Sequence, residues 1–357
     1  MTRAAPQRPV RATDAFADRL LAWFDRHGRH DLPWQHPRTP YRVWVSEIML
    51  QQTQVRTVIP YFERFVARFP DVAALAAAPL DDVLALWSGL GYYARARNLH
   101  RAAQLCVADH GGELPATAEG LAALPGIGES TANAIFSQAH DVPAPVLDGN
   151  VRRVLSRHDA IEGWSGEAAV AEALWRAARQ RLPERRGADY TQAIMDLGAT
   201  VCRRGAPDCA ACPVATDCVA RATGRTGDLP TPKPRPKVRA VRLELLIART
   251  PDGRVLLERR PPRGIWGGLW SLPEGEDARR AVAARGGAPE RPLAPLEHRL
   301  THRVLHIRPS HAAVDECPGT LEYEREHGWF APAEWRALGL PRPIATLLET
   351  LEREIEA

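Results

Sequence analysis

The sequence predicts an all-α domain followed by a smaller α+β domain, and three observations lead to this fold class. From residue 15 to about residue 221, apolar residues recur at helical spacing without a strand pattern between them. A stretch rich in Pro, Gly, Lys and Arg follows, and beyond it apolar residues alternate with the period of two that is typical of strands. With 357 residues, the chain is long enough for two domains that each bury a core.

Short breaks at Gly or Pro separate the helices expected in the first domain, residues 1–221. These helices cover residues 16–24, 41–54, 57–69, 81–87, 92–108, 117–124, 130–139, 151–157, 167–181 and 189–201. The third is expected to begin near Pro60, because the first turn of a helix tolerates a residue without an N–H. Thr117 is the expected N-cap of the helix that follows it.

A tight turn, Leu124-Pro-Gly-Ile-Gly128, joins two of these helices into a helix-hairpin-helix over about residues 117–139. Gly126 and Gly128 lack a Cβ atom, so the backbone can take positive φ and approach a ligand with its N–H groups pointing outward. The turn could therefore hold a phosphate without a basic side chain. On these residues alone, an ordinary helix connection is an equally good interpretation.

Two carboxylates are candidates for chemistry. Glu47 lies between Val45 and Ile48 on a helix with few other charges, and apolar surroundings raise the pKa of a carboxyl group towards neutral pH. Asp148 follows the hairpin in the run Val-Leu-Asp-Gly-Asn-Val. Each has a simpler explanation: Glu47 as a solvated helix charge, and Asp148 as the N-cap of the next helix.

Four of the six cysteines fall in one short stretch, at Cys202, Cys209, Cys212 and Cys218. In a cytoplasmic protein such a set indicates a metal or iron–sulfur site rather than disulfides. Zinc usually takes paired Cys-x2-Cys units and only one such pair is present, so four unevenly spaced thiolates suit a [4Fe-4S] cluster better. Four unrelated buried thiols are a weak alternative, because the residues between them are polar and loop-like.

Residues 222–239 form the expected linker, which is extended, Pro-rich and basic. In the second domain, residues 240–357, we expect strands over 241–248, 254–259, 298–308 and 312–314, with a hairpin turn at Pro251-Asp-Gly253. Helices are expected over 279–285 and 342–355.

Composition narrows the cellular setting. No window of eighteen uninterrupted apolar residues occurs, and the polar, Pro-rich N-terminus lacks the apolar core of a signal peptide. We therefore expect a cytoplasmic protein that does not bind membranes, with a monomer as the expected state. The net charge of +4 permits a nucleic-acid partner without requiring one.

Taken together, these stretches resemble the endonuclease III superfamily of base-excision glycosylases, and most closely its MutY-type adenine glycosylase branch. The cysteine spacing and the run Val-Ser-Glu-Ile-Met-Leu-Gln-Gln-Thr, which ends at Thr53, carry the resemblance most specifically. Leu32-Pro-Trp34, Gly89-Leu-Gly-Tyr-Tyr93, the hairpin and the second domain extend it along nearly the whole chain. It implies a bacterial, nucleoid-associated enzyme that excises adenine opposite 8-oxoguanine or guanine in duplex DNA, after flipping the adenine out of the stack.

The resemblance also implies roles for individual residues. Glu47 would protonate adenine at N7 and later help to activate water, while Asp148 would stabilise positive charge at C1′, directly or through a covalent intermediate. Asn150 and Ser130 would hydrogen-bond this site. The residues expected to contact adenine, the opposite strand or phosphates are Gln192, Gln52, Thr53, Leu90, Tyr92, Arg95, Gly126 and Gly128. The [4Fe-4S] cluster would take no part in the chemistry.

Ser130 occupies the hairpin position at which bifunctional relatives carry a Lys, whose amine attacks the sugar and cuts the strand. The chain has only two lysines, Lys233 and Lys237, and both lie outside the helical domain. We therefore expect removal of the base without efficient strand cleavage.

The second domain resembles the Nudix-like lesion-reading domain of the same family. A Nudix hydrolase needs a glutamate-rich helix to bind magnesium, and the matching residues 277–289 contain no glutamate, so we expect a binding domain rather than a nucleotide pyrophosphatase. Thr301 and His302 match a Ser-His pair that would contact 8-oxoguanine, and Leu300 replaces the Phe before it. His298, His302 and His306 are expected on one face of a strand, towards solvent or DNA rather than a metal.

Two other functions remain open: a uracil or thymine mismatch glycosylase of the same superfamily, and a non-catalytic iron–sulfur protein that binds damaged DNA. The Nudix-like domain argues against the first, because such an enzyme would not need it. The joint presence of Glu47 and Asp148 argues against the second, because a binding protein needs neither.

Overall fold

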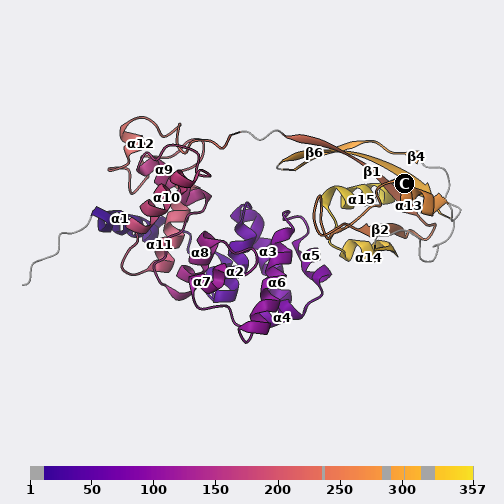
Figure 1. The fold of residues 1–357 in the computed structure, drawn as a ribbon, viewed down its shortest axis with the longest axis horizontal. Coiled ribbons are helices and arrows are strands. Elements are labelled where there is room, and N and C mark those ends of the chain that lie inside the picture. The colour runs from indigo at the N-terminus through magenta and orange to yellow at the C-terminus, as the bar shows by residue number, and fades with distance from the viewer. Residues whose placement is uncertain (1–11, 235–237, 284–290, 301, 315–325, 357) are drawn as a thin grey trace, which may run out of the picture. The chain divides into compact units, whose positions relative to one another are not determined.

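The structure is a computed structural model, and it describes residues 12–234, 238–283, 291–300, 302–314 and 326–356. Contacts divide the chain into two compact units. The first comprises residues 1–76 and 101–234, and the second comprises residues 77–100 and 235–357. In the described part of the chain, the first unit is helical and the strands belong to the second (Figure 1), which confirms the predicted fold class.

The helices before residue 234 follow the predicted order but differ at several ends. They are α1 (Ala12–His27), η1 (Pro33–Gln35), α2 (Pro40–Leu50), α3 (Val55–Arg68), α4 (Val72–Ala77), α5 (Leu80–Trp87), α6 (Ala94–Asp109), α7 (Ala118–Ala122), α8 (Glu129–His140), α9 (Gly149–His158), α10 (Ala168–Gln180), α11 (Gly187–Asp196), η2 (Leu197–Val201) and α12 (Val219–Ala222). The prediction for Pro60 is wrong. Because α3 begins at Val55, Pro60 lies inside the helix, where it removes one backbone hydrogen bond.

A core of apolar side chains holds the first unit together. Phe16, Leu20 and Phe24 line one side of α1 at helical spacing, and all three are almost completely buried. They belong to one cluster with side chains of α9, α10 and α11, including Val151, Val154, Leu155, Leu174, Ala193 and Ile194. Val146 and Leu147, which directly precede Asp148, are buried in the same cluster, so packing fixes the segment that carries this carboxylate.

The second unit is built on a mixed sheet. Its strands are β1 (Arg239–Arg249), β2 (Val255–Arg259), β3 (Trp270–Ser271), β4 (Arg291–Pro292), β5 (Leu296–Leu300), β6 (Arg303–Ala313) and β7 (His327–Phe330). Their order is β3-β2-β1-β6-β4, with β5 paired to β6 and β7 paired to β2. β1 and β6 run parallel, whereas β1 and β2 form the antiparallel hairpin that the turn at Pro251-Asp-Gly253 predicts.

Helices cover both faces of this sheet (Figure 1). α14 (Pro332–Ala337) and α15 (Arg342–Glu356) bury Trp335, Ile344 and Leu348 in a cluster on one face. α13 (Glu276–Ala283) packs Val282 into a smaller cluster on the other face. The sequence does not predict α14, β3, β4 or β7, because such short elements give no clear periodicity.

The prediction of one strand over residues 298–308 is wrong. β5 ends at Leu300, β6 begins at Arg303, and the two strands pair antiparallel as a hairpin. The three histidines therefore do not share a strand face: His298 is on β5, His302 is in the turn and His306 is on β6. Thr301 lies outside the described residues.

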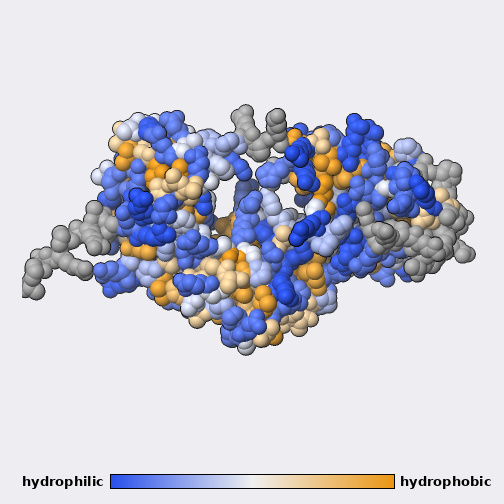
Figure 2. Space-filling view, in the orientation of Figure 1, coloured by the Kyte–Doolittle hydropathy of each residue, from blue (hydrophilic) through white to orange (hydrophobic). Residues whose placement is uncertain are grey.

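The surface seen in Figure 2 is mostly hydrophilic, with hydrophobic areas between the hydrophilic ones. The large apolar side chains that the described residues expose are Tyr92, Val107, Val142, Val219 and Val238. None of the helices in the described part of the chain combines the length and the apolar character needed to cross a membrane.

A close contact between α9 and the π-helical turn η2 depends on glycine at position 198. A Cβ atom on Gly198 would lie 2.6 Å from the Cβ atom of Asn150 and 3.0 Å from its backbone. Both distances are too short for non-bonded carbon atoms, whose optimal separation is roughly 3.5–4.0 Å. The first turn of α9 and the turn η2 therefore fix each other's position.

Gly198→Ala should destabilise the helical unit by about 1–3 kcal/mol, because the added methyl group forces α9 and η2 apart. Thermal unfolding followed by circular dichroism measures this change. Gly227→Ala is the matched control, since a Cβ atom at Gly227 would meet nothing within 4 Å. Equal midpoints for the two variants would contradict the contact described here.

Candidate active site

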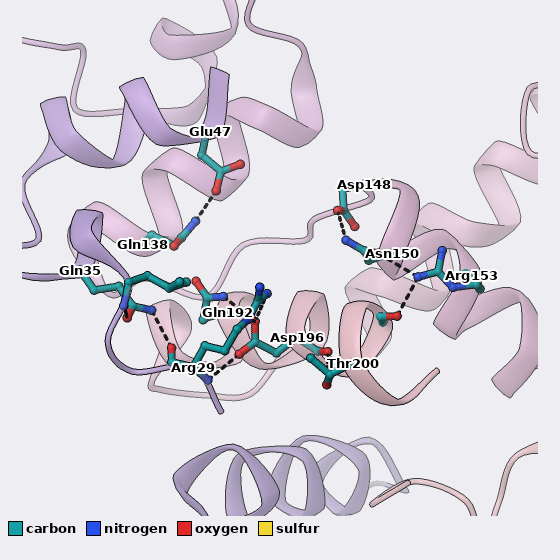
Figure 3. Close-up of polar contacts among 12 residues, drawn as sticks. Arg29, Gln35, Glu47, Gln138, Asp148, Asn150, Arg153, Gln192, Asp196 and Thr200 are labelled. Carbon is teal, nitrogen blue, oxygen red and sulfur yellow. Dashed lines mark hydrogen bonds and ion pairs between the residues drawn. The ribbon is translucent and has the colours of Figure 1, made fainter. Parts of the chain in front are cut away.

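Glu47 lies on α2, where that helix packs against α8. The side chains on either side of it in sequence, Ser46 and Ile48, are buried, and Glu47 is only partly exposed. The amide Nε2 of Gln138 on α8 donates a hydrogen bond to Oε1 of Glu47 at 2.7 Å (Figure 3). Burial raises the pKa of Glu47 to about 7, while the hydrogen bond from Gln138 lowers it and the charge of Asp148 raises it. The raised pKa confirms the sequence prediction and distinguishes Glu47 from a solvated helix charge.

Asp148 is the N-cap of α9, as its simpler explanation predicts, and it is also a largely enclosed carboxylate. Its Oδ1 accepts the backbone N–H of Val151 at 2.7 Å, and its Oδ2 accepts from Nδ2 of Asn150 at 3.1 Å. Burial raises the pKa of Asp148, and these hydrogen bonds together with the charge of Arg153 oppose the rise. The two explanations are therefore compatible, because the cap fixes the orientation of a carboxylate whose charge also raises the pKa of Glu47.

Asn150 connects Asp148 to the cysteine-rich loop. Its Oδ1 accepts from Nη2 of Arg153 at 2.8 Å, and the same nitrogen donates to the carbonyl oxygen of Gly198 at 2.7 Å. Nε of Arg153 donates to the carbonyl oxygen of Cys202 at 2.7 Å. One arginine thus bridges the start of α9, the turn η2 and the first cysteine of the loop.

The hairpin adopts the predicted form, with one difference between its glycines. Thr117 caps α7 through its Oγ1, as predicted, and Gly126 has a φ of 80°. Gly128 has a φ of −90° and serves as the N-cap of α8, so the prediction of positive φ holds only for Gly126. A Cβ atom on Gly128 would meet nothing within 4 Å, which leaves space beside the turn.

Ser130, in the first turn of α8, holds the segment before Asp148. Its Oγ accepts the backbone N–H of Leu147 at 2.9 Å. A longer side chain at this position would lose that hydrogen bond. Ser130 is partly exposed and follows the turn, two residues before Ala132, the first buried residue of α8.

Gln192, the residue expected to contact adenine, is part of a buried network that the sequence did not reveal. Its Nε2 donates to Oδ1 of Asp196 at 2.7 Å, one turn along α11. Asp196 is 1% exposed, and the backbone N–H and Nε of Arg29 donate to its two oxygens at 2.8 and 2.9 Å (Figure 3). Gln35 in turn donates to the carbonyl oxygen of Arg29 at 3.1 Å. The network orients the carboxamide of Gln192 by engaging its nitrogen.

The residues expected to meet the opposite strand are divided between the two units. Gln52 and Thr53 follow α2 in the first unit, and Gln52 is exposed with a φ of 61°. Leu90, Tyr92 and Arg95 belong to the second unit. Tyr92 is 45% exposed with a φ of 50°, whereas Leu90 is buried. For non-glycine residues such positive φ values are uncommon and occur where a loop presents a side chain.

Arg95 is not at the surface, where a phosphate contact would place it. It is 8% exposed, and its Nη2 donates to the carbonyl oxygens of Leu90 and Gly91 at 3.3 and 3.1 Å. Burial lowers the pKa of Arg95 to about 10, with the charge of Tyr92 opposing this. Its position indicates support of the turn that carries Leu90 and Tyr92.

The four clustered cysteines line one pocket together with Val154, Arg157 and Leu197. None of the four forms a disulfide, and Nη1 of Arg157 lies 3.3 Å from Sγ of Cys202. Burial raises the pKa of Cys212 to about 11, and neighbouring cysteines contribute to the rise. In the part of the chain that the structure describes, no three His, Cys, Asp or Glu side chains are grouped so that they could hold a metal ion.

The candidate lesion-contact residues of the second unit are only partly described. Thr301 is outside the described residues, and His302 is exposed in the turn between β5 and β6. Leu300 packs at the edge of the cluster beneath α14 and α15. His298 lies beside the ring of Trp266, with 6.4 Å between ring centroids.

Three residues of the site, Gln138, Arg29 and Asp196, are not predicted from the sequence. Gln138 sits at a helical spacing that reads as core, and its partner Glu47 is 91 residues away in sequence. Arg29 and Asp196 are 167 residues apart. The one indication in the sequence is that polar residues stand on helix faces whose other residues are apolar, since a buried polar group needs a hydrogen-bond partner.

Comparisons with known proteins cover both units. The sequence model of the HhH-GPD superfamily base excision DNA repair proteins matches residues 45–180, which include Glu47, the hairpin and Asp148. The model of the NUDIX domain matches residues 245–350. Among solved structures, a thermostable thymine-DNA glycosylase is 26% identical with a TM-score of 0.53, covering 59% of this chain and 97% of that one. An endonuclease III in a non-covalent DNA complex, 22% identical with a TM-score of 0.50, covers 58% of this chain and 94% of its own and shares the fold.

Curated relatives match over longer stretches. An adenine DNA glycosylase from Buchnera aphidicola subsp. Acyrthosiphon pisum is 34% identical over 349 residues, which are 95% of this chain and 98% of that protein. The human adenine DNA glycosylase is 45% identical over 223 residues, covering 60% of this chain and 41% of that protein. With sequence matches over both its helical unit and its Nudix-like second unit, the chain belongs to the adenine DNA glycosylase family of the HhH-GPD superfamily.

Proposed function

We propose that this protein is a base-excision repair glycosylase that removes adenine from duplex DNA where it is mispaired with 8-oxoguanine or guanine. It hydrolyses the N-glycosidic bond and stops there, without efficient strand cleavage. It acts as a monomer on the DNA of a bacterial cytoplasm, in association with the nucleoid. Family membership over 95% of the chain supports the excision of adenine. The single observation that carries the mechanism is the pair of enclosed carboxyl groups, Glu47 and Asp148, with unlike hydrogen-bond partners.

Glu47 is the general acid. With a pKa of about 7, its carboxyl group is protonated in part of the molecules at neutral pH, and it can give that proton to N7 of a flipped adenine. The C1′–N9 bond then breaks with its electron pair moving to the base, which leaves as neutral adenine. The resulting carboxylate of Glu47 takes a proton from the water that adds to C1′.

Asp148 stabilises the positive charge that develops on the sugar. Its N-cap hydrogen bonds hold it at the end of α9, and Asn150 orients its second oxygen. The carboxamide of Gln192 contacts the edge of adenine, and Asp196 holds the nitrogen of that amide. Gly126 and Gly128 bind a DNA phosphate with backbone N–H groups, since a helix N-terminus favours anions. Gln52, Thr53 and Tyr92 meet the opposite strand, and His302 with Thr301 contributes to contact with the lesion.

Ser130 is the reason that the reaction stops after base removal. Its hydroxyl group accepts a hydrogen bond from the backbone N–H of Leu147 and has no amine nitrogen, so it cannot form a Schiff base with the sugar. Lys233, which the sequence places in the linker, belongs to the first unit and is the one lysine among its described residues; its ammonium group lies against the ring of Trp164. Neither the hydroxyl group of Ser130 nor the side chain of Lys233 supplies an amine at the hairpin.

Cys202, Cys209, Cys212 and Cys218 hold a [4Fe-4S] cluster in this proposal. Four cysteine side chains line one pocket, and four thiolates are the ligand number that a [4Fe-4S] cluster requires. When bound, the cluster supplies covalent cross-links that stabilise the loop, and it takes no part in breaking the glycosidic bond. Arg157 contributes hydrogen bonds to the carbonyl oxygen of Arg203 and lies against Cys202.

A thymine mismatch glycosylase is the second candidate, because a thymine-DNA glycosylase shares the fold of the helical unit. That likeness covers 59% of the chain and leaves the Nudix-like unit unexplained. The adenine DNA glycosylase of Buchnera aphidicola matches both units. We therefore favour adenine as the base that is removed.

The substrate proposal predicts the outcome of single-turnover reactions on four duplexes: A opposite 8-oxoguanine, A opposite G, T opposite G and U opposite G. Breaks should appear only in the strand that contained adenine, and only after alkali, because alkali cleaves the abasic product. Borohydride should trap no enzyme–DNA adduct at the rate of base release. Release of T or U would support the second candidate, and a trapped adduct would contradict the role of Ser130.

Glu47→Gln should slow adenine release by roughly 10²–10⁴-fold, because the amide cannot act as a general acid. Binding of the mispaired duplex should be retained, since the substitution keeps the shape of the side chain. Single-turnover rates and a gel-shift titration measure the two properties. The exposed Glu63→Gln on α3 is the control and should react at the wild-type rate. Turnover retained in Glu47→Gln would remove Glu47 from its role.

Cys212→Ser should lower the content of iron and acid-labile sulfide in the purified protein, together with its thermal midpoint, because one of the four ligands is lost. Cys106→Ser provides the control, since Cys106 is buried in α6 and is not among the residues that line the pocket of the loop cysteines. The control should keep its iron. A wild-type protein that contains one zinc ion and no sulfide would contradict the cluster proposal.

A further inference from the structure

Gln138 is a buried amide on the otherwise largely apolar inner face of α8. It is 3% exposed, and the neighbouring buried positions of the helix include Ala134 and Ile135. The other polar side chain buried on this helix, Ser137, is paired with Thr191 of α11 at 2.9 Å. A buried carboxamide costs stability unless it is hydrogen-bonded. The hydrogen bond that Gln138 makes is to Oε1 of Glu47.

The direction of this hydrogen bond distinguishes the two oxygens of Glu47. The amide nitrogen of glutamine only donates, so the Oε1 atom facing it must accept. When Glu47 is protonated, a hydrogen on Oε1 in that direction would meet a second hydrogen on Nε2. The arrangement is satisfied when Oε1 is the carbonyl oxygen of the acid and Oε2 carries the hydrogen.

We propose that Gln138 is a positioning residue for the proton donor, because its carboxamide engages Oε1 of Glu47 and so assigns the transferable proton to Oε2. This inference rests on the proposed function of Glu47 as the general acid. Gln138 does not touch the substrate. It acts by holding the carboxyl group in one orientation, so that the oxygen that carries the proton is the one left for the adenine.

Gln138 also sets the pH range in which Glu47 is protonated. Three elements pack against α2, namely α3, α8 and η1. Asp148, at the start of α9, is the charged residue whose interaction raises the pKa of Glu47. Burial and Asp148 favour the neutral acid, while the donor from Gln138 favours the carboxylate. Gln138 thus keeps the acid strong enough to protonate adenine near neutral pH.

The experiment measures single-turnover adenine release from pH 5 to 9 in the wild-type protein and in Gln138→Met, which keeps the length of the side chain but lacks the donor. Because the acid form of Glu47 is the active one, the wild-type rate should fall as the pH rises through about 7. Loss of a hydrogen bond that favours the carboxylate raises the pKa, so the falling limb of Gln138→Met should move up by about one pH unit. Its rate at low pH should fall by about three- to tenfold, because the carboxyl group is no longer held in one orientation.

Ser137→Ala is the matched control on the same helix. It removes the hydrogen bond with Thr191 and leaves the contact between Gln138 and Glu47 intact. A substitution that acts only through packing should lower thermal stability, and the rate of adenine release should fall at the same pH as in the wild-type protein. Gln138→Glu provides a second test should Gln138→Met fold poorly. Its added negative charge should move the falling limb upward further than methionine does.

The outcomes separate this inference from the proposed function. If Glu47→Gln is inactive and the pH limbs of Gln138→Met and Gln138→Glu coincide with that of the wild type, the role of Gln138 is overturned while Glu47 keeps its own. If Glu47→Gln remains active, the proposed acid is wrong and the inference about Gln138 falls with it. An upward shift in the Gln138 variants and none in Ser137→Ala supports the positioning role.

Discussion

Enclosing carboxyl groups away from water is the constraint on which the helical unit depends, since an uncompensated buried charge costs several kcal/mol. The structure compensates three of them in three ways. Asp196 faces a guanidinium group from Arg29, Asp148 receives the N–H groups at the start of α9, and Glu47 receives a neutral amide from Gln138. A neutral partner leaves Glu47 able to exist with or without a proton. The kind of partner therefore separates a structural carboxylate from one suited to acid–base chemistry.

α9 joins that chemistry to the cysteine-rich loop. Asp148 caps the helix, and Arg153 and Arg157, about one and two turns further on, reach the carbonyl oxygens of Cys202 and Arg203. The guanidinium group of Arg153 also holds Asn150, which orients Asp148. Because the same short helix carries all four side chains, the position of the loop and the orientation of the carboxylate depend on each other.

Much of the fold could be predicted from the sequence, because the helical periodicity of the first unit and the alternation of the second are strong signals. The hairpin of β5 and β6 was read as one strand, since residues 300–303, Leu-Thr-His-Arg, contain none of the Gly, Pro, Asn or Asp that usually marks a tight turn. The carboxylates and cysteines of the site stand out by residue type and spacing. Their partners do not stand out, because the roles of Gln138, Arg29 and Asp196 depend on hydrogen bonds to residues that are distant in sequence. Arg95 is expected at the surface, as is usual for a charged side chain, but it is buried.

The π-helical turn η2 limits where residues can be inserted into or deleted from the chain. In a regular α-helix each residue advances the side-chain direction by about 100°, and a π turn accommodates one residue more than an α turn does. Residues 197–201 thus set the rotation between α11, which carries Gln192 and Asp196, and Cys202 beyond the turn. Removing one residue here would restore a regular helix and redirect everything after it by roughly a quarter of a turn. Insertions and deletions should accordingly be excluded from this turn, even though much of the loop that follows it lies at the surface.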